Sequence, residues 1–213
     1  MVKGDRTKAI NLLRQVVKQD SDHVRAYLQL GNIIKDDNPL QAIKIHQSLT
    51  VRPNLPTDIK VDIHRSLAND YFTVGQFNKA KEEAKQILLL EKRNLWALEF
   101  LISLAEKNKE WDDAANWTKQ MHRITGKKQN DDVAKFDVYK GLDCLKNSQI
   151  EEAKSFFNKA IKLSPKFSLS YQYLGDVYAE TRDLVKAVEN WENFASLDLE
   201  NGKEVYTKIE TAL

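Results

Sequence analysis

A pattern of small and aromatic residues occurs twice in this 213-residue chain, with a spacing of 34 positions between the copies. The first copy comprises Gly141, Ala153, Phe157 and Ala160, and the second comprises Gly175, Ala187, Trp191 and Phe194. Self-similarity at a fixed period of this length is typical of stacked helix pairs. The small residues allow two antiparallel helices to cross closely, and the large residue fills the space against the next pair. The pattern therefore predicts that the glycines are buried at helix crossings.

This period and these residue types are the signature of tetratricopeptide repeats. We expect an all-α fold, a right-handed α-solenoid of antiparallel helix pairs, with about eleven helices, no strand, and Gly31 and Ala68 also at crossings. A single domain should cover residues 1–213. Its expected divisions are a half repeat at 1–23, complete repeats at 24–57, 61–94, 95–128, 134–167 and 168–201, and the start of a further helix at 202–213. Pro39 should begin the second helix of the first repeat, and residues 126–132 should form a polar loop.

Both ends of the chain are expected to be cut. Residues 5–20 carry the apolar stripe of a second helix whose first helix is missing, and the segment Val205–Leu213 begins a first helix without its second. Helices at the ends of such an array lack one packing neighbour. The terminal helices should therefore expose apolar side chains and offer surfaces for self-association.

Composition excludes several classes of function. The net charge of +2 and the absence of any basic run of five residues argue against nucleic-acid binding. The longest apolar runs are only a few residues, so no membrane span is expected. The single cysteine excludes a disulfide framework within the chain and favours a reducing, cytoplasmic compartment.

No catalytic, cofactor or metal site is expected, and the chain is predicted not to be an enzyme. The four histidines are scattered and lack the spacing of metal ligands. His46 occupies a packing position on the second helix of its repeat, so a packed histidine is expected there. Cys144 falls at a position that is normally in the core, which predicts an inert buried thiol.

Protein binding remains, and the first helices of the repeats should line the inner wall of the solenoid. The candidate partner-binding residues on that wall are Arg25, Asn32, Arg65, Asn69, Phe72, Trp96, Phe100, Tyr139 and Tyr173. Aromatic side chains on a wet face are typical contact anchors, although an ordinary solvated groove is an equally good interpretation. Arg65 and Asn69 match half of the carboxylate clamp of chaperone-binding repeats. Phe100 stands where the clamp needs an asparagine, so a complete clamp is rejected.

One stretch is more specific than a generic repeat. Residues 42–49 (AIKIHQSL), the RPNLP loop at 52–56 and the pattern Leu67, Asp70–Tyr71, Gly75 resemble the lipopolysaccharide assembly protein B (LapB) family. The resemblance continues more weakly over residues 5–213. The shortened turn at Asp36–Pro39 and the AKFDVYKG segment (134–141) depart from the family pattern. The family's N-terminal membrane anchor and its metal domain with paired CxxC motifs are absent from this sequence, so the resemblance covers the central repeat segment only.

The resemblance implies an adaptor at the cytoplasmic face of the bacterial inner membrane. There the family promotes degradation of the deacetylase LpxC by the membrane protease FtsH and so limits lipopolysaccharide synthesis. LpxC and FtsH are therefore the implied partners. The alternative is a generic peptide-binding or assembly module in another pathway. A catalytic or metal domain in flanking sequence would concern the parent protein and not this chain.

Overall fold

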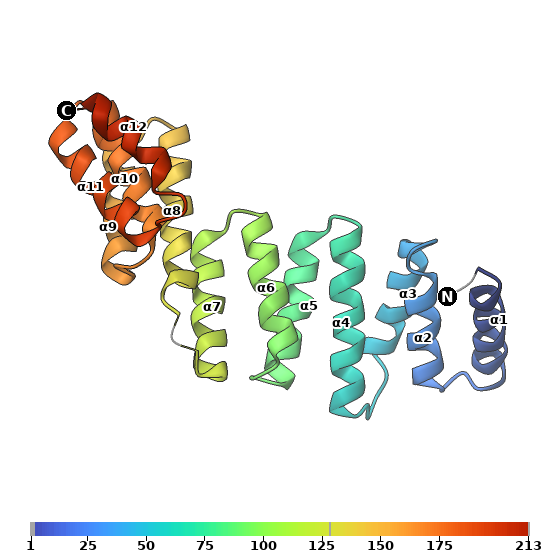
Figure 1. The fold of residues 1–213 in the computed structure, drawn as a ribbon. Helices are drawn as coiled ribbons and strands as arrows, with labels where there is room; N and C mark the ends of the chain where they lie inside the picture. Colours follow the sequence, from blue (N-terminus) through green and yellow to red (C-terminus); the bar gives the residue numbers. More distant parts are fainter. Residues whose placement is uncertain (1–2, 128, 213) are drawn as a thin grey trace. The chain divides into compact units, whose positions relative to one another are not determined.

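The computed structural model describes residues 3–127 and 129–212. This part of the chain forms twelve α-helices and no strand, which confirms the all-α prediction (Figure 1). The helices are α1 (Lys3–Gln19), α2 (Val24–Ile34), α3 (Pro39–Thr50), α4 (Thr57–Thr73), α5 (Phe77–Leu90), α6 (Leu95–Lys107), α7 (Trp111–Thr125), α8 (Asp131–Lys146), α9 (Ile150–Leu163), α10 (Ser168–Glu180), α11 (Leu184–Leu197) and α12 (Lys203–Ala212). Residues 1–2, 128 and 213, which fall in the expected half repeat, polar loop and last helix, lie outside the described residues.

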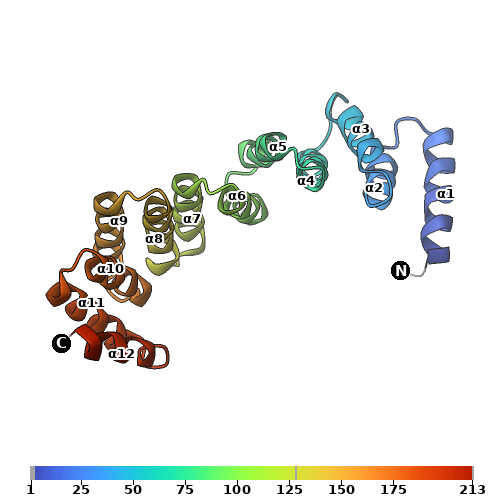
Figure 2. The same ribbon diagram turned by 90° about the horizontal axis from the view of Figure 1, so that it is seen from above.

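The backbone divides into two compact units, Met1–Leu104 and Ala105–Leu213. In the first unit, each of the helices α1 to α4 packs against the next one in sequence, and α2 also contacts α4 (Figure 2). In the second unit, α8 and α9 form one tightly packed pair and α10 and α11 another, and α12 packs on α11. Each unit is thus a stack of antiparallel helix pairs, as the sequence period predicts. The division into a single domain over residues 1–213 stays a prediction.

The predicted helix crossings are confirmed at Gly31, Gly141 and Gly175, all of which are buried. A Cβ atom at these positions would lie 2.3 Å from His46 Nε2, 2.4 Å from Phe157 Cε1 and 2.6 Å from Trp191 Cδ1, respectively. Ala68 is fully buried at the equivalent place on α4. In each glycine pair the large side chain of the second helix lies directly over the glycine of the first. Any side chain there would force the two helices apart.

Two helices begin earlier than the repeat divisions predict. α4 starts at Thr57 rather than near 61, directly after Pro56. α8 starts at Asp131, so the expectation that residues 131–132 belong to the polar loop was wrong. Acidic residues in the first turn stabilise both starts, because the helix N-terminus carries a partial positive charge. In contrast, α3 begins at Pro39 as predicted, and the Asn38 side chain accepts a hydrogen bond from Gln41 N at 3.2 Å.

The terminal helices differ in how much apolar surface they leave uncovered. None of the described side chains of α1 is fully buried, and Leu12 is 62% exposed. In α12, Val205 and Ile209 are buried against the core formed with Trp191, so the expected exposure was wrong for them. The α10–α11 pair covers these two residues, and Tyr206, at 54%, is the exposed aromatic side chain of α12. No helix in the described ranges is long and apolar enough to cross a membrane.

Candidate protein-interaction surfaces

Seven of the nine candidate residues lie in the first unit, and four of them form one continuous stack. The guanidinium of Arg65 lies over the Trp96 ring, 5.2 Å from its centroid. Trp96 stacks on Phe100 with 5.1 Å between ring centroids, and Phe100 meets Phe72 edge-on at 5.8 Å. We call these four residues the α4–α6 aromatic stack. It joins an apolar surface to a cationic group, a combination that suits a peptide with aromatic or acidic side chains.

The stack is also part of the structural core. Phe72 and Phe100 are half-buried and pack against the cluster that contains Leu67, Tyr71 and Leu104. A partner would therefore meet the exposed edges of these rings and not whole side chains. Truncating either phenylalanine would remove packing as well as contact surface, so Arg65 is the better position for a binding test.

The three polar candidates of the first unit other than Arg65 are engaged within the protein. Arg25 pairs with Asp58 at 3.1 Å, between Nη2 and Oδ2, and both side chains are exposed. Asn32 Oδ1 accepts a hydrogen bond from Ser66 Oγ at 2.9 Å. Asn69 Nδ2 donates to the carbonyl oxygen of Arg65 at 3.0 Å, one turn earlier in the same helix. The amide of Asn69 is thus used within its own helix, so the half clamp formed by Arg65 and Asn69 is not arranged to bind a carboxylate.

The two candidates of the second unit sit on different helices. Tyr139 on α8 is 38% exposed and contacts Trp111, with 5.0 Å between ring centroids. Trp111 Nε1 donates to Asp143 Oδ2 at 2.8 Å, and this hydrogen bond is the main cause that lowers the pKa of the Asp143 carboxyl. Tyr173 on α10 is half-buried and stacks on Phe157 at 5.9 Å. Tyr139 is therefore the more accessible of the two.

The His-Gln dipeptide of the specific stretch has a structural role. His46 is fully buried, as its predicted packing position requires, and its Nδ1 lies 2.6 Å from Asp70 Oδ2. The next residue, Gln47, donates from Nε2 to the Tyr71 hydroxyl at 2.7 Å. Burial is the main cause that raises the pKa of this hydroxyl. Two consecutive residues of α3 thus pair with two consecutive residues of α4, which joins adjacent repeats by polar contacts.

Metal-ligating side chains do not gather in the described ranges, which include no group of three or more His, Cys, Asp or Glu residues that could hold a metal ion. Cys144 is half-buried rather than fully buried. Burial raises the pKa of its thiol, followed by the charges of Glu152 and Asp143. The protonated form is favoured, and this form is a poor nucleophile.

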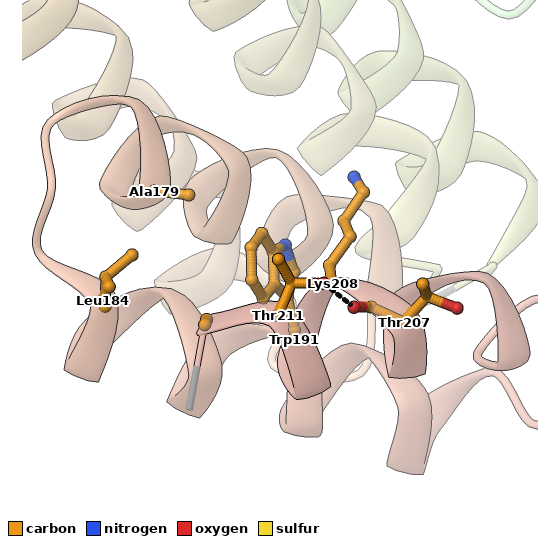
Figure 3. Close-up of a pocket in the computed structure, with 7 residues that line it drawn as sticks. Ala179, Leu184, Trp191, Thr207, Lys208 and Thr211 are labelled. Atoms are coloured by element: carbon orange, nitrogen blue, oxygen red, sulfur yellow. Dashed lines mark hydrogen bonds between the residues drawn. The ribbon is translucent and has the colours of Figure 1, made fainter.

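A hollow of about 370 Å³ lies beside the last helix. Figure 3 shows Trp191 between Ala179 and Leu184 on one side and three residues of α12 on the other. Those residues are Thr207, Lys208 and Thr211. The lining of this hollow is mainly apolar. The hollow lies at the C-terminal helix, where we expect a surface for self-association.

The sequence reasoning missed a basic groove in the second unit. Two hollows of about 400 and 340 Å³ share the lining residues Lys119, Val133 and Leu163, so they are adjacent parts of one surface. We call it the α7–α9 groove, since α7 and α9 line its sides and Val133 and Asp137 of α8 line its floor. The charged residues that line it are Lys119, Arg123, Lys127, Lys140, Lys159 and Lys162, with Asp112 and Asp137.

The sequence signal for this groove is the spacing of basic residues along two helices. Lys119 and Arg123 are four residues apart, so they share a face of α7, and Lys159 and Lys162 are similarly placed on α9. A search for consecutive basic residues cannot detect such a set. A search at helical spacing on the second helices of adjacent repeats would have found it.

Comparison with known proteins agrees with the fold and with the resemblance. Two models described as tetratricopeptide repeat match residues 144–167 and 156–189. A solved tetratricopeptide repeat protein from Parabacteroides merdae shares the fold, with a TM-score of 0.53, 16% identity and coverage of 99% of this chain and 88% of that one.

Curated relatives are more specific. Lipopolysaccharide assembly protein B of Escherichia coli strain K12 is 23% identical over 212 residues, which cover 99% of this chain and 54% of that protein. The Haemophilus influenzae protein of the same name is 29% identical over 171 residues, which cover 78% of this chain and 42% of that protein. The chain thus spans about half the length of these relatives. The chain has the fold of a tetratricopeptide-repeat solenoid, and its sequence is similar, over nearly its whole length, to lipopolysaccharide assembly protein B.

Proposed function

We propose that this chain is the repeat segment of a LapB-type adaptor that limits lipopolysaccharide synthesis by promoting FtsH-dependent turnover of LpxC. It acts by binding proteins and without catalysis. The observation that carries the proposal is the pairing of His46 with Asp70 and of Gln47 with Tyr71. These four residues belong to the stretch that most resembles the family, and a generic repeat does not need them. Similarity to the Escherichia coli protein along 99% of the chain supports the same assignment.

The proposed partner-binding residues are the nine candidates on the first helices of the repeats, seven in the first unit and two in the second. In the first unit the α4–α6 aromatic stack is the centre of this set, because Trp96 and Phe100 supply apolar area while Arg65 supplies a cation for an acidic group. Contacts at the centre of an interface carry most of the binding energy since water is excluded there. In the natural protein, this surface would work at the cytoplasmic face of the inner membrane.

The test uses Arg65→Glu in the full-length natural protein. Reversing this charge should weaken capture of LpxC or FtsH and lengthen the lifetime of LpxC in cells. Lys44→Glu is the matched control, since Lys44 is exposed on α3 and has no ion-pair partner among the described residues. The melting midpoint of each variant shows whether it is folded.

Three outcomes decide the proposal. Weaker capture by Arg65→Glu alone, with a folded protein, supports both the function and the surface. Normal LpxC turnover when the whole gene is deleted would reject the LapB-type function in favour of a generic repeat module. Normal capture by a folded Arg65→Glu protein would move the binding surface away from the aromatic stack.

A further inference from the structure

The α7–α9 groove concentrates positive charge. Its lining holds six lysine and arginine side chains and two carboxylates, so it carries four net positive charges. The whole chain carries only +2. The remaining residues are therefore net negative, and the charge of the groove is a local feature rather than a general property of the surface. A charged hollow of this kind attracts ligands of opposite charge and raises their local concentration.

Most of the positive charge is held by side chains that are free to bind. Within the described ranges, Lys119, Arg123, Lys127 and Lys162 are exposed and have no carboxylate partner within ion-pair distance. The other two cations are partly neutralised. Lys140 pairs with Asp112 and lies 3.6 Å from Asp137 Oδ1, and Lys159 also lies 3.6 Å from that oxygen.

The shape and the lining favour a peptide over a polyphosphate. Val133, Leu163 and Ala115 give the groove an apolar part, which apolar side chains of a peptide can contact but a chain of phosphates cannot use. The lining residues of α7 run from 112 to 123, which corresponds to about 16 Å along the helix axis. An extended peptide of about five residues covers this length.

We infer that the α7–α9 groove binds a short acidic segment of a protein partner, in which carboxylates alternate with apolar side chains. The carboxylates pair with the four unpaired cations, and the apolar side chains contact Val133 and Leu163. This surface is lined by the second helices α7 and α9 and by Val133, Asp137 and Lys140 of the first helix α8, and none of the nine candidate residues of the proposed adaptor surface lines it. It is therefore an additional binding site, and it does not depend on the LapB-type function.

The test measures binding of a labelled peptide of alternating glutamate and leucine to the full 213-residue chain by fluorescence anisotropy. The matched peptide with glutamine in place of glutamate should bind much more weakly. Lys119→Glu combined with Lys162→Glu should weaken binding by about tenfold or more, since both attractions become repulsions. Both side chains are exposed and unpaired, so folding should be unaffected. Binding should also weaken as salt is raised.

Lys44→Glu combined with Lys203→Glu is the control, because it changes the net charge equally at exposed positions outside the groove. Equal loss of affinity in both double variants would overturn the inference, since attraction would then depend on total charge alone. Equal binding of the two peptides would also overturn it. A chain that ignores the acidic peptide but binds phosphatidylglycerol vesicles through Lys119 and Lys162 would show that the groove meets a membrane surface instead.

Discussion

Replacing Gly141 with leucine tests the closest helix crossing of the second unit. A Cβ atom at this position would lie 2.4 Å from Cε1 of Phe157 and 2.8 Å from two further atoms of the same ring. Carbon atoms in protein interiors pack at about 3.5–4.0 Å. The ring would therefore have to retreat by about 1 Å or more. Phe157 is fully buried and stacks on Tyr173, so it has no free space to enter.

The expected cost follows from two opposing effects. Overpacking a core destabilises a protein by about 1–3 kcal/mol. Replacing a helical glycine by a better helix former stabilises the folded state by up to about 1 kcal/mol. Gly141→Ala should therefore cost about 0–2 kcal/mol. Leucine adds three more carbon atoms to the same clash, so Gly141→Leu should cost at least about 2 kcal/mol.

Urea denaturation followed by circular dichroism measures this cost, and hydrogen exchange of the α8 and α9 amides shows whether the loss is local. The second measurement is needed because two compact units need not unfold together. Gly126→Asn is the control. Gly126 has φ of 72°, and a Cβ atom added there would meet no other atom within 4 Å. Asparagine tolerates this backbone conformation, so the effect should be within about 0.5 kcal/mol.

Combining Gly141→Leu with Phe157→Ala separates the clash from other causes. Removing the ring alone should cost about 3–5 kcal/mol through the cavity that it leaves. In the double variant the leucine side chain can occupy part of that space, so the total should be smaller than the sum of the single costs. Strictly additive costs, or an unchanged midpoint for Gly141→Leu, would refute the reasoning that this glycine is required by the crossing.

Three further predictions concern other contacts. His46→Ala should destabilise the first unit by about 3–5 kcal/mol in urea denaturation, because it leaves the buried carboxylate of Asp70 unpaired. The double variant His46→Phe with Asp70→Leu should recover most of this loss. A small cost for His46→Ala would contradict the prediction. Trp111→Phe should raise the pKa of Asp143 in an NMR titration, because the indole hydrogen bond is the main cause that lowers it. A depressed folded-state pKa stabilises the protein at pH values above the unfolded pKa, and this stability is lost as pH falls through the folded pKa. Trp111→Phe should therefore lose less stability on acidification than the wild type. An unchanged pKa of Asp143 in this variant would contradict the prediction. Leu12→Glu should reduce self-association in sedimentation experiments, since Leu12 is 62% exposed on α1, and a wild-type chain that stays monomeric at high concentration would exclude that surface.

Much of the fold could be predicted from the sequence because its rules are local. The 34-residue period, the glycines at 141 and 175 and the prolines at 39 and 56 each reflect a steric requirement within one repeat. A small residue is needed wherever two helix axes approach closely, and proline is tolerated only at a helix start or outside it. These requirements apply in every copy, so repetition in the sequence reveals them without knowledge of the neighbours.

The polar contacts between repeats could not be predicted in the same way. The repeat pattern puts His46 at a packing position, but its partner Asp70 is 24 residues away and on the next helix pair. Which side chain of α4 meets α3 depends on the angle and the axial offset of the two helices. It is therefore the arrangement of helices in space that makes two consecutive residues face two others.

The residue pattern of the chain is sufficient to specify a helical array with buried glycine crossings, but the place where charge gathers depends on tertiary packing. The net charge of +2 and the lack of basic runs gave no reason to expect an electropositive site. Lys119 and Lys162 are 43 positions apart, yet packing on α8 brings both to the lining of one groove. The physical reason is that charge acts through space rather than along the chain, so its distribution depends on which helix faces the fold places together.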